Sequence, residues 1–294
     1  MPFTYHCHSG EFCLHASGKL EEVIMQAISL GFKVIGLSEH APRNRTEDLY
    51  PEEVNVEYLA ESFSNYVLEA RKLKTKYKDQ IEILIGMETE WILGGISDNQ
   101  IGFLKEFDLE FIVGSLHHVK GIPIDFSKEL YTKAIEVCGG INLLYENYFQ
   151  EQFDMVDKLR PDIIGHFDLI RMFGDGHPLS SKAYEIVNRT VDLAISYGAL
   201  FEINSRAYKK SLPYPYPHPD VLKIIIDKGG KLTVSDDSHS PDQLALFYPL
   251  MVEYLLEMNI QTIYYLTKDQ STNKVIVKEY ENFFDDRFWA SNIS

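Results

Sequence analysis

Short apolar runs alternate along this chain with segments of helical periodicity, and this alternation limits the folds open to it. Val34–Leu37 is a typical run, and it follows a segment in which apolar residues recur every three or four positions from Leu20 to Ile28. Buried strands separated by amphipathic helices predict a parallel sheet that helices cover on both faces. The same alternation places further candidate strands at 3–5, 83–85, 111–113, 163–164, 200–203 and 232–234, and candidate helices at 54–77, 183–197 and 221–228.

The candidate strands run directly into histidines and carboxylates. Six of the ten histidines follow such strands, and Glu88, Asp168 and Asp237 do the same. Because the carboxyl ends of parallel strands meet at one edge, where ligands and catalytic groups collect, these side chains are expected to converge. The histidines concerned are His6, His8, His40, His117, His166 and His239.

Two pairs of these residues have the spacing of a two-pronged metal ligand. His6 with His8, and Asp237 with His239, are two positions apart, so on extended backbone both members of a pair project to the same face. The pairs lie at opposite ends of the sequence, and a closed barrel makes the first and last strands neighbours. Imidazole and carboxylate ligands without a thiolate suit zinc, manganese or iron in a catalytic site that keeps a position open for water.

Three residues close to these positions receive separate predictions. Cys13 is expected to pack in the interior, whereas His15, two residues later, is expected to bind metal. His118 directly follows His117 and should point away from it on extended backbone. His118 is therefore a candidate proton donor, or a residue that orients the ligands.

The composition and charge exclude several classes of protein. Hydrophobic residues make up 45% of the chain, which is ordinary for a globular protein. The excess of 44 acidic over 28 basic residues gives a net charge of −16, which disfavours a nucleic-acid partner. We expect no membrane partner and a cytoplasmic location, because the sequence has no long apolar run and no secretory leader, and its three cysteines lack CxxC spacing. No linker or repeat divides the chain, so residues 1–294 are expected to form a single domain.

The motifs around the expected ligands resemble, in their order, those of the polymerase-and-histidinol-phosphatase (PHP) superfamily of metal-dependent phosphoesterases. The resemblance runs from residue 6 to residue 239. The segments Cys13-Leu14-His15-Ala16 and Glu202-Ile203-Asn204-Ser205 are similar to its histidinol-phosphate phosphatase branch. The motifs are His6-Cys7-His8-Ser9, Ser38-Glu39-His40, Gly86-Met87-Glu88, Gly114-Ser115-Leu116-His117, Gly165-His166-Phe167-Asp168 and Ser235-Asp236-Asp237-Ser238-His239.

The resemblance implies a distorted (β/α)7 barrel, a TIM-like α/β fold, with three divalent metal ions at the carboxyl ends of the strands. The barrel would occupy about residues 1–258, and a β-hairpin would follow at about 260–280. Glu88 and Asp237 would bridge metals, since a carboxylate has two oxygens to offer and a neutral imidazole has one nitrogen lone pair. The implied ligands are His6, His8, His15, His40, Glu88, His117, His166, Asp237 and His239.

The same resemblance implies that the chain hydrolyses L-histidinol phosphate to L-histidinol and inorganic phosphate, a step of histidine biosynthesis. A hydroxide held between the metals would attack phosphorus. Asp237 and His239 would act at the reacting phosphate, and Asp168 or His118 would protonate the leaving alkoxide.

Four cations are candidates for binding the phosphate. Arg171 comes first because it closely follows His166 and Asp168, and Arg206, Lys209 and Arg43 come after it. The superfamily branch commonly has an arginine where this chain has Lys209, and a lysine loses the bidentate fork that suits a phosphate.

Other functions stay open on the sequence alone. Another PHP phosphoesterase, such as a phosphotyrosine phosphatase or an exonuclease, would use the same ligands, although the net charge disfavours a nuclease. A metal-dependent amidohydrolase also places an HxH motif early and an aspartate late on a barrel, but no lysine follows a candidate strand here to bridge its metals. A purely structural metal site would need four ligands, fewer than this chain offers.

Overall fold

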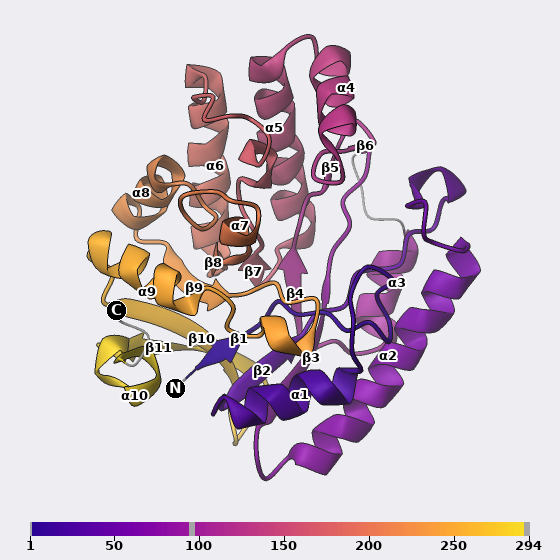
Figure 1. The fold of residues 1–294 in the computed structure, drawn as a ribbon, viewed down its shortest axis with the longest axis vertical. Coiled ribbons are helices and arrows are strands. Elements are labelled where there is room, and N and C mark those ends of the chain that lie inside the picture. The colour runs from indigo at the N-terminus through magenta and orange to yellow at the C-terminus, as the bar shows by residue number, and fades with distance from the viewer. Residues whose placement is uncertain (1, 94–97, 291–294) are drawn as a thin grey trace.

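Seven parallel strands form a nearly closed barrel in the computed structural model, which describes residues 2–93 and 98–290. Beyond the first and last strands, the amide of His8 donates to the carbonyl of Ser238 at 2.7 Å, next to a parallel bridge between Cys7 and Ser238. This contact joins the two ends of the sheet, and the predicted barrel is confirmed (Figure 1). The strands pair in the order β1 (Phe3–Thr4), β2 (Val34–Leu37), β3 (Glu82–Glu88), β4 (Phe111–Gly114), β7 (Ile163–Ile164), β8 (Leu200–Asn204) and β9 (Lys231–Ser235).

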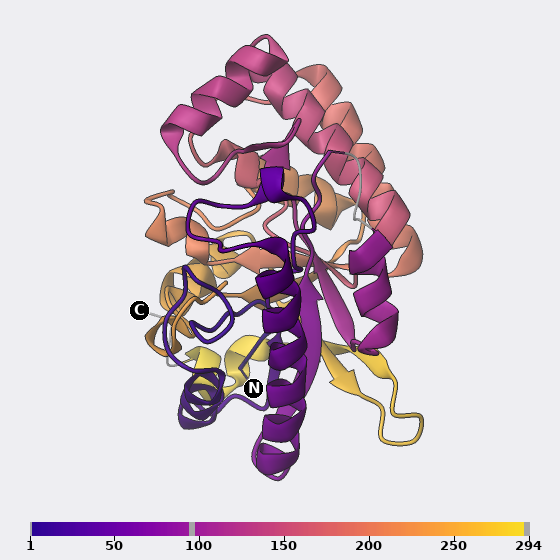
Figure 2. The same ribbon diagram turned by 90° about the vertical axis from the view of Figure 1, so that its right-hand side faces the viewer.

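Helices cover the outside of the barrel and connect its strands (Figures 1 and 2). α1 (Leu20–Ser29) buries an apolar stripe, and its first turn is capped where the Glu22 carboxylate accepts the Lys19 amide at 2.7 Å. The remaining helices are α2 (Val56–Tyr77), α3 (Asp98–Glu106), α4 (Lys128–Cys138), α5 (Ile141–Leu159), α6 (Ser181–Tyr197), α7 (Arg206–Lys209), α8 (Pro219–Asp227), α9 (Tyr248–Glu257) and α10 (Arg287–Ala290), with short 3-10 turns η1 (Thr46–Asp48), η2 (Leu169–Arg171), η3 (Pro241–Gln243) and η4 (Phe283–Asp285).

The connection between β4 and β7 is the most elaborate. It contains a small antiparallel pair, β5 (His118–Val119) and β6 (Ile122–Pro123), followed by α4 and α5. α5 then runs beside α6 along the outside of the barrel (Figure 2). The pair β5 and β6 sets the path of the chain on one side of the barrel mouth.

The barrel interior is filled tightly by aromatic side chains. Tyr5, from the end of the first strand, and Phe111, from β4, are both buried. They meet over Gly36 of β2, where a Cβ would lie 2.6 Å from the Tyr5 ring and 2.7 Å from the Phe111 ring. Glycine is therefore required at this point of β2 by close approach.

A terminal hairpin covers the amino ends of the strands. β10 (Thr262–Lys268) and β11 (Val275–Glu281) pair in antiparallel register, at the place where two β-rich runs were expected. The Tyr5 hydroxyl donates to the carbonyl of Leu266 at 2.6 Å, and Glu82, at the start of β3, accepts the amide of Lys268 at 2.6 Å. Those contacts leave the carboxyl ends of the strands as the open end of the barrel. None of the described helices is long and apolar enough to cross a membrane.

Candidate metal centre

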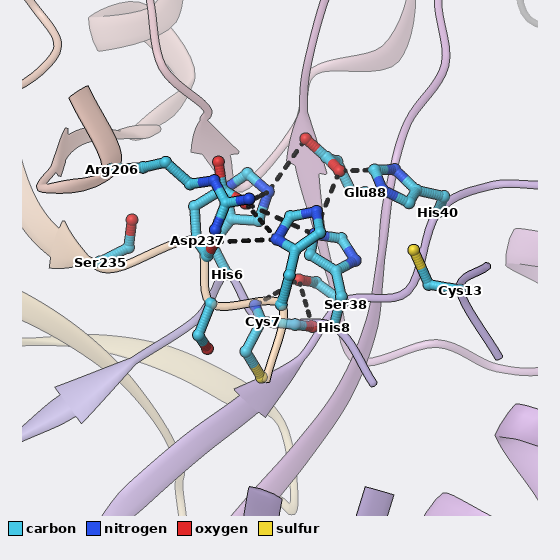
Figure 3. Close-up of polar contacts among 12 residues, drawn as sticks. His6, Cys7, His8, Cys13, Ser38, His40, Glu88, Arg206, Ser235 and Asp237 are labelled. Atoms are coloured by element: carbon cyan, nitrogen blue, oxygen red, sulfur yellow. Dashed lines mark hydrogen bonds and ion pairs between the residues drawn. The ribbon is translucent and has the colours of Figure 1, made fainter. Parts of the chain in front are cut away.

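Glu88 lies at the centre of a group of imidazoles at the carboxyl ends of the strands. Its Oε1 is 2.9 Å from His6 Nε2, 3.2 Å from His166 Nε2 and 3.4 Å from His117 Nε2. Its Oε2 is 2.8 Å from His40 Nδ1 and 3.5 Å from His8 Nε2. The two oxygens therefore face different imidazoles, which is the arrangement of a carboxylate that bridges two cations (Figure 3).

Asp237 joins this group from the other end of the sequence. Its Oδ1 is 3.7 Å from both His6 Nε2 and His8 Nε2. The residue follows β9 and has a φ of 47°, in the left-handed region that few residues other than glycine adopt. This sharp turn brings Asp237 to the mouth, and closure of the barrel places it against the first strand's His-x-His pair, as the sequence predicts.

Hydrogen bonds fix the orientation of several imidazoles. His6 Nδ1 donates to Glu202 Oε1 at 2.8 Å, and His117 Nδ1 donates to the Glu90 carboxylate. His239 Nδ1 donates to the carbonyl of Asp237 at 3.0 Å. Because each Nδ1 carries its proton toward an acceptor, the Nε2 atom keeps a lone pair for a metal, as in carboxylate–histidine–metal arrangements.

Glu202, to which the sequence motifs gave no separate role, contacts the expected ligand His6. It is buried on β8, where its oxygens also accept the amide of His166 at 2.7 Å and the hydroxyl of Ser235 at 2.5 Å. Although burial opposes ionisation, His6 and these donors lower the pKa of Glu202 to about 2. A lone glutamate within the apolar run at 200–203 was the signal in the sequence.

A second group of donor atoms lies beside the first. His15 Nε2 is 3.2 Å from His40 Nε2 and 3.3 Å from the Cys13 sulfur, and His239 completes the group. Cys13 is buried and free, in agreement with the packing role expected for it, although its sulfur also faces His15. His15 is half exposed and lies at the outer edge of the centre.

Burial keeps several of these imidazoles neutral. It lowers the pKa of His8 and of His239 well below the usual range, and it lowers the pKa of His15 to about 3. His6, His40 and His117 behave differently, because neighbouring carboxylates outweigh burial. Glu88 raises the pKa of His6 and raises that of His40 to about 10, and Glu90 raises the pKa of His117. Neutral imidazole is the form that binds a metal.

The donor atoms fit a metal centre. Buried polar atoms are nearly always hydrogen-bonded, so a cluster without partners indicates an additional ligand. Within the described residues, the atoms at the centre that lack a hydrogen-bond partner are His6 Nε2, His8 Nδ1, His8 Nε2, His40 Nδ1, Glu88 Oε2 and His166 Nδ1. Overlapping sets of donors lie within 4.8 Å of one another. Three sets of three combine imidazoles with a carboxylate, and one set of four joins the Cys13 sulfur to three imidazoles. These residues can therefore bind divalent metal.

Arg171, the first candidate to bind the phosphate, forms an ion pair on the side of the barrel toward α8. Its guanidinium donates to both oxygens of Asp220, at 2.8 and 3.0 Å, and lies 3.8 Å from Asp168. Within the described part of the chain, Arg171 is not among the residues that line the cavity at the centre. The 3-10 turn after β7 directs this side chain toward Asp220 of α8, which disfavours the phosphate-binding role expected for Arg171.

The other candidate cations divide into two groups. Arg206 lines the cavity, and its Nη1 is held by the carbonyl of Asp237 at 2.9 Å and by Gln243 at 2.8 Å. Lys210 lines the cavity, whereas the neighbouring Lys209 is not among the described lining residues. Arg43 lines the cavity too, but Glu53 and Glu90 both accept hydrogen bonds from it.

The two candidate proton donors also lie off the cavity surface. Asp168 is buried, and its Oδ2 accepts the amide of His218 at 3.0 Å, so this side chain holds the loop before α8. His118 is buried as well, and its ring stacks on Tyr50 with a centroid distance of 5.9 Å. Neither is among the described residues that line the cavity, which disfavours direct proton transfer from either.

Comparisons with known proteins agree with this architecture. The model of the PHP domain family matches residues 4–206. A protein of Schizosaccharomyces pombe named probable histidinol-phosphatase is 43% identical, over 99% of this chain and 96% of its own length. The histidinol-phosphatase of Saccharomyces cerevisiae is 30% identical, over 98% of this chain and 99% of its own length.

Solved structures resemble the fold. The hisK protein of Listeria monocytogenes superimposes with a TM-score of 0.73 at 23% identity, over 85% of this chain and 99% of its own. The histidinol phosphate phosphatase of Lactococcus lactis, solved with zinc, L-histidinol and phosphate, gives a TM-score of 0.59 at 22% identity, over 81% of this chain and 86% of its own. From the family match and the relatives of full length together, the chain belongs to the PHP domain family.

Proposed function

We propose that this chain is a metal-dependent phosphatase that hydrolyses L-histidinol phosphate to L-histidinol and inorganic phosphate, a step of histidine biosynthesis. The observation that carries the proposal is the similarity over nearly the full length to two relatives named as histidinol-phosphatases, at 43% and 30% identity. The more distant relative from Lactococcus lactis was solved with zinc, L-histidinol and phosphate, which agrees with the same substrate.

We further propose that three divalent ions, zinc, iron or manganese, bind at the centre. The overlapping donor sets support more than one ion, because Glu88 and His40 each belong to two of them. Bound ions of this kind supply Lewis acidity toward phosphoryl oxygens and lower the pKa of a water molecule. The proposed ligands are His6, His8, His15, His40, Glu88, His117, His166, Asp237 and His239.

The side chains of the protein position the phosphate and the ligands. Arg206 is the leading candidate to bind phosphoryl oxygens, because it lines the cavity and its guanidinium is already oriented by Asp237 and Gln243. Lys210 adds a second positive charge on the same side. Glu202 and Glu90 act through His6 and His117, by holding each ring with Nε2 toward the centre.

Phosphate release from L-histidinol phosphate tests the proposal. We expect turnover by the metal-loaded protein, loss of activity after chelation, and recovery when zinc, iron or manganese is added back. Phosphotyrosine, a short oligonucleotide and a cyclic amide test the alternative activities in parallel. Comparable or faster turnover of any of these, or chelator-resistant hydrolysis of L-histidinol phosphate, would contradict the proposal.

We also propose that the protein works in a reducing compartment such as the cytoplasm. All three cysteines, Cys7, Cys13 and Cys138, are buried and free. An oxidising compartment favours disulfides in secreted proteins, and these residues form none.

A further inference from the structure

The outer group of donor atoms differs in composition from the rest of the centre. It consists of the Cys13 sulfur and one nitrogen from each of three imidazoles, those of His15, His40 and His239, and all four atoms lie within 4.8 Å of one another. Among the donor sets of the described residues, the other three each contain a carboxylate, whereas this one does not. One sulfur with three imidazoles suits zinc better than it suits manganese, which prefers oxygen ligands.

The distances between these atoms fit a single tetrahedral ion. Bonds of about 2.0–2.1 Å to nitrogen and about 2.3 Å to sulfur place two nitrogens about 3.3 Å apart, and a nitrogen and a sulfur about 3.6 Å apart. His15 Nε2 is 3.2 Å from His40 Nε2 and 3.3 Å from the Cys13 sulfur. One imidazole nitrogen offers one lone pair or one proton, so hydrogen bonding alone accounts for only one of these two contacts. A shared cation accounts for both.

Two of the rings have their other nitrogen engaged elsewhere. His239 Nδ1 donates to the carbonyl of Asp237 at 3.0 Å, and His40 Nδ1 lies 2.8 Å from Glu88 Oε2. In both rings, Nε2 is therefore the nitrogen left for the outer group. A separate cavity of about 30 Å³ has Cys13 and His40 in its lining, so the sulfur is not enclosed by apolar side chains alone.

The turn that carries Cys13 is held in place by its own contacts. The Cys13 amide donates to the Ser9 carbonyl at 2.9 Å, and Ser9 donates its amide and its hydroxyl to Glu39 Oε1 at 2.8 and 2.7 Å. On the far side of the turn, the amide of Ser17 donates to the carbonyl of His239 at 2.8 Å. The position of the sulfur is therefore fixed by the backbone and by a buried carboxylate.

The two other thiols provide an internal comparison. The Cys7 sulfur lies 3.3 Å from the carbonyl of Gly36 and points away from the imidazoles in Figure 3, although Cys7 stands between two expected ligands. Cys138 ends α4. All three cysteines are buried and free, yet within the described residues the Cys13 sulfur alone belongs to a donor set.

We infer that Cys13 is a metal ligand and completes a zinc-selective outer site, with the three imidazoles of its group as the other ligands. The inference rests on the metal centre of the proposed function. Binding converts the thiol to a thiolate and releases its proton to solvent, so no oxidant or reductant takes part. Four protein ligands close this position, whereas the donor sets with Glu88 or Asp237 offer oxygen atoms that manganese and iron also accept.

Zinc X-ray absorption spectroscopy of the zinc-loaded protein tests the ligation directly. The variants are Cys13→Ser and Cys13→Ala, and the matched control is Cys138→Ser, which removes a buried thiol outside the donor sets. We expect a sulfur scatterer at about 2.3 Å from zinc in the unmodified protein and in the control, and its loss in both Cys13 variants. The cobalt-loaded proteins should show the same pattern in the sulfur-to-cobalt charge-transfer band. Thermal unfolding is measured for each protein.

A competition experiment tests the selectivity. The unmodified protein, loaded with zinc and manganese together, should retain about one zinc ion per chain against a chelator that removes the manganese. Cys13→Ser should weaken the affinity for this zinc about a hundredfold or more, which exceeds the loss typical for residues that only orient the ligands. The control should match the unmodified protein.

The outcomes separate the outer site from the function. Full metal content in the unmodified protein without a sulfur scatterer, or a sulfur scatterer that persists in both Cys13 variants, would overturn the ligation by Cys13 and leave the metal centre standing. A sulfur scatterer lost in both variants, in a protein that fails to hydrolyse L-histidinol phosphate, would support the outer site and overturn the proposed substrate. Failure of the unmodified protein to bind metal would overturn the centre and the outer site together.

Discussion

Strand β3 carries a glutamate at each end, and the two side chains have opposite environments. Glu82, at the amino end, accepts the Thr267 hydroxyl at 2.7 Å and the Lys268 amide at 2.6 Å, both from β10. Glu88, at the carboxyl end, faces five imidazoles, and its Oε2 has no hydrogen-bond partner. Both carboxylate oxygens of Glu82 therefore accept hydrogen bonds from the protein, whereas Glu88 has one oxygen that accepts none.

The difference extends to the two ends of the barrel. Near the amino end, charges are paired with one another: Glu110 binds both Lys74 and Lys268 and accepts the amide of Ile85 at 2.8 Å. At the carboxyl end, imidazoles and carboxylates lie close together, and several of their buried nitrogen and oxygen atoms have no hydrogen-bond partner. Paired charges hold a structure together, whereas unpaired buried donors prepare a site for a cation.

The largest effect is expected from Glu88→Gln. The glutamine amide keeps the shape of the side chain but cannot bridge two cations, so we expect the bound metal content to fall. The rate of phosphate release should drop about a thousandfold or more, which exceeds the loss typical for residues that only hydrogen-bond to the metal ligands. Metal analysis and kinetics with L-histidinol phosphate measure both effects. Normal metal content with normal turnover would remove Glu88 from the centre.

Asp237→Asn tests the partner carboxylate with a smaller perturbation. Asparagine tolerates the left-handed backbone at φ 47°, so the fold should be preserved. We expect phosphate release to fall about a hundredfold or more, because one carboxylate ligand is lost. Circular dichroism should match that of the unmodified protein, and near-normal turnover would refute the role assigned to Asp237.

Glu202→Gln tests orientation rather than ligation. Glutamine at this position can no longer accept hydrogen bonds through both oxygens from His6, His166 and Ser235. We expect metal affinity to weaken about tenfold to a hundredfold, as for other residues that orient a metal-binding histidine. Titration against a competing chelator measures the affinity, and activity should recover at saturating metal. An unchanged affinity would restrict Glu202 to a structural role.

Glu82→Gln is the counterpart of Glu88→Gln on the same strand and should have the smallest effect on activity. It weakens the contact between β3 and the hairpin, so we expect the free energy of unfolding in urea to fall by about 1–2 kcal/mol. Metal content and kcat should stay unchanged. A loss of metal in Glu82→Gln would show that the two ends of the barrel are coupled, and that Glu82 does not have a purely structural role.

Much of the site could be predicted because its residues follow from the order of the strands and from the spacing of residues at the strand ends. Strand ends in a parallel sheet point to one edge, and residues two apart on extended backbone share a face, so the sequence placed His6, His8 and Glu88 close to Asp237. Closure of the barrel then joined the first and last pairs. These relations need no knowledge of how any loop runs.

The side chains that depend on loop paths could not be predicted. In the sequence, Arg171 and Arg206 both lie a few residues after a candidate strand. In the structure, however, the turn after β7 pairs Arg171 with Asp220, whereas α7 brings Arg206 to the cavity. Lys210 lines the cavity in place of Lys209 for the same reason, since one residue along a helical end rotates a side chain to another face.

The sequence by itself determined the barrel, the order of its motifs and the residue types that meet at its mouth. Tertiary structure decided which of those groups are satisfied by the protein and which face the cavity. The His6 and His117 imidazoles donate hydrogen bonds to Glu202 and Glu90, and the ring of Tyr50 stacks on that of Phe126. Each of these contacts joins segments far apart in the chain. Local periodicity carries no information about such contacts, because they arise from the packing of loops onto a completed barrel.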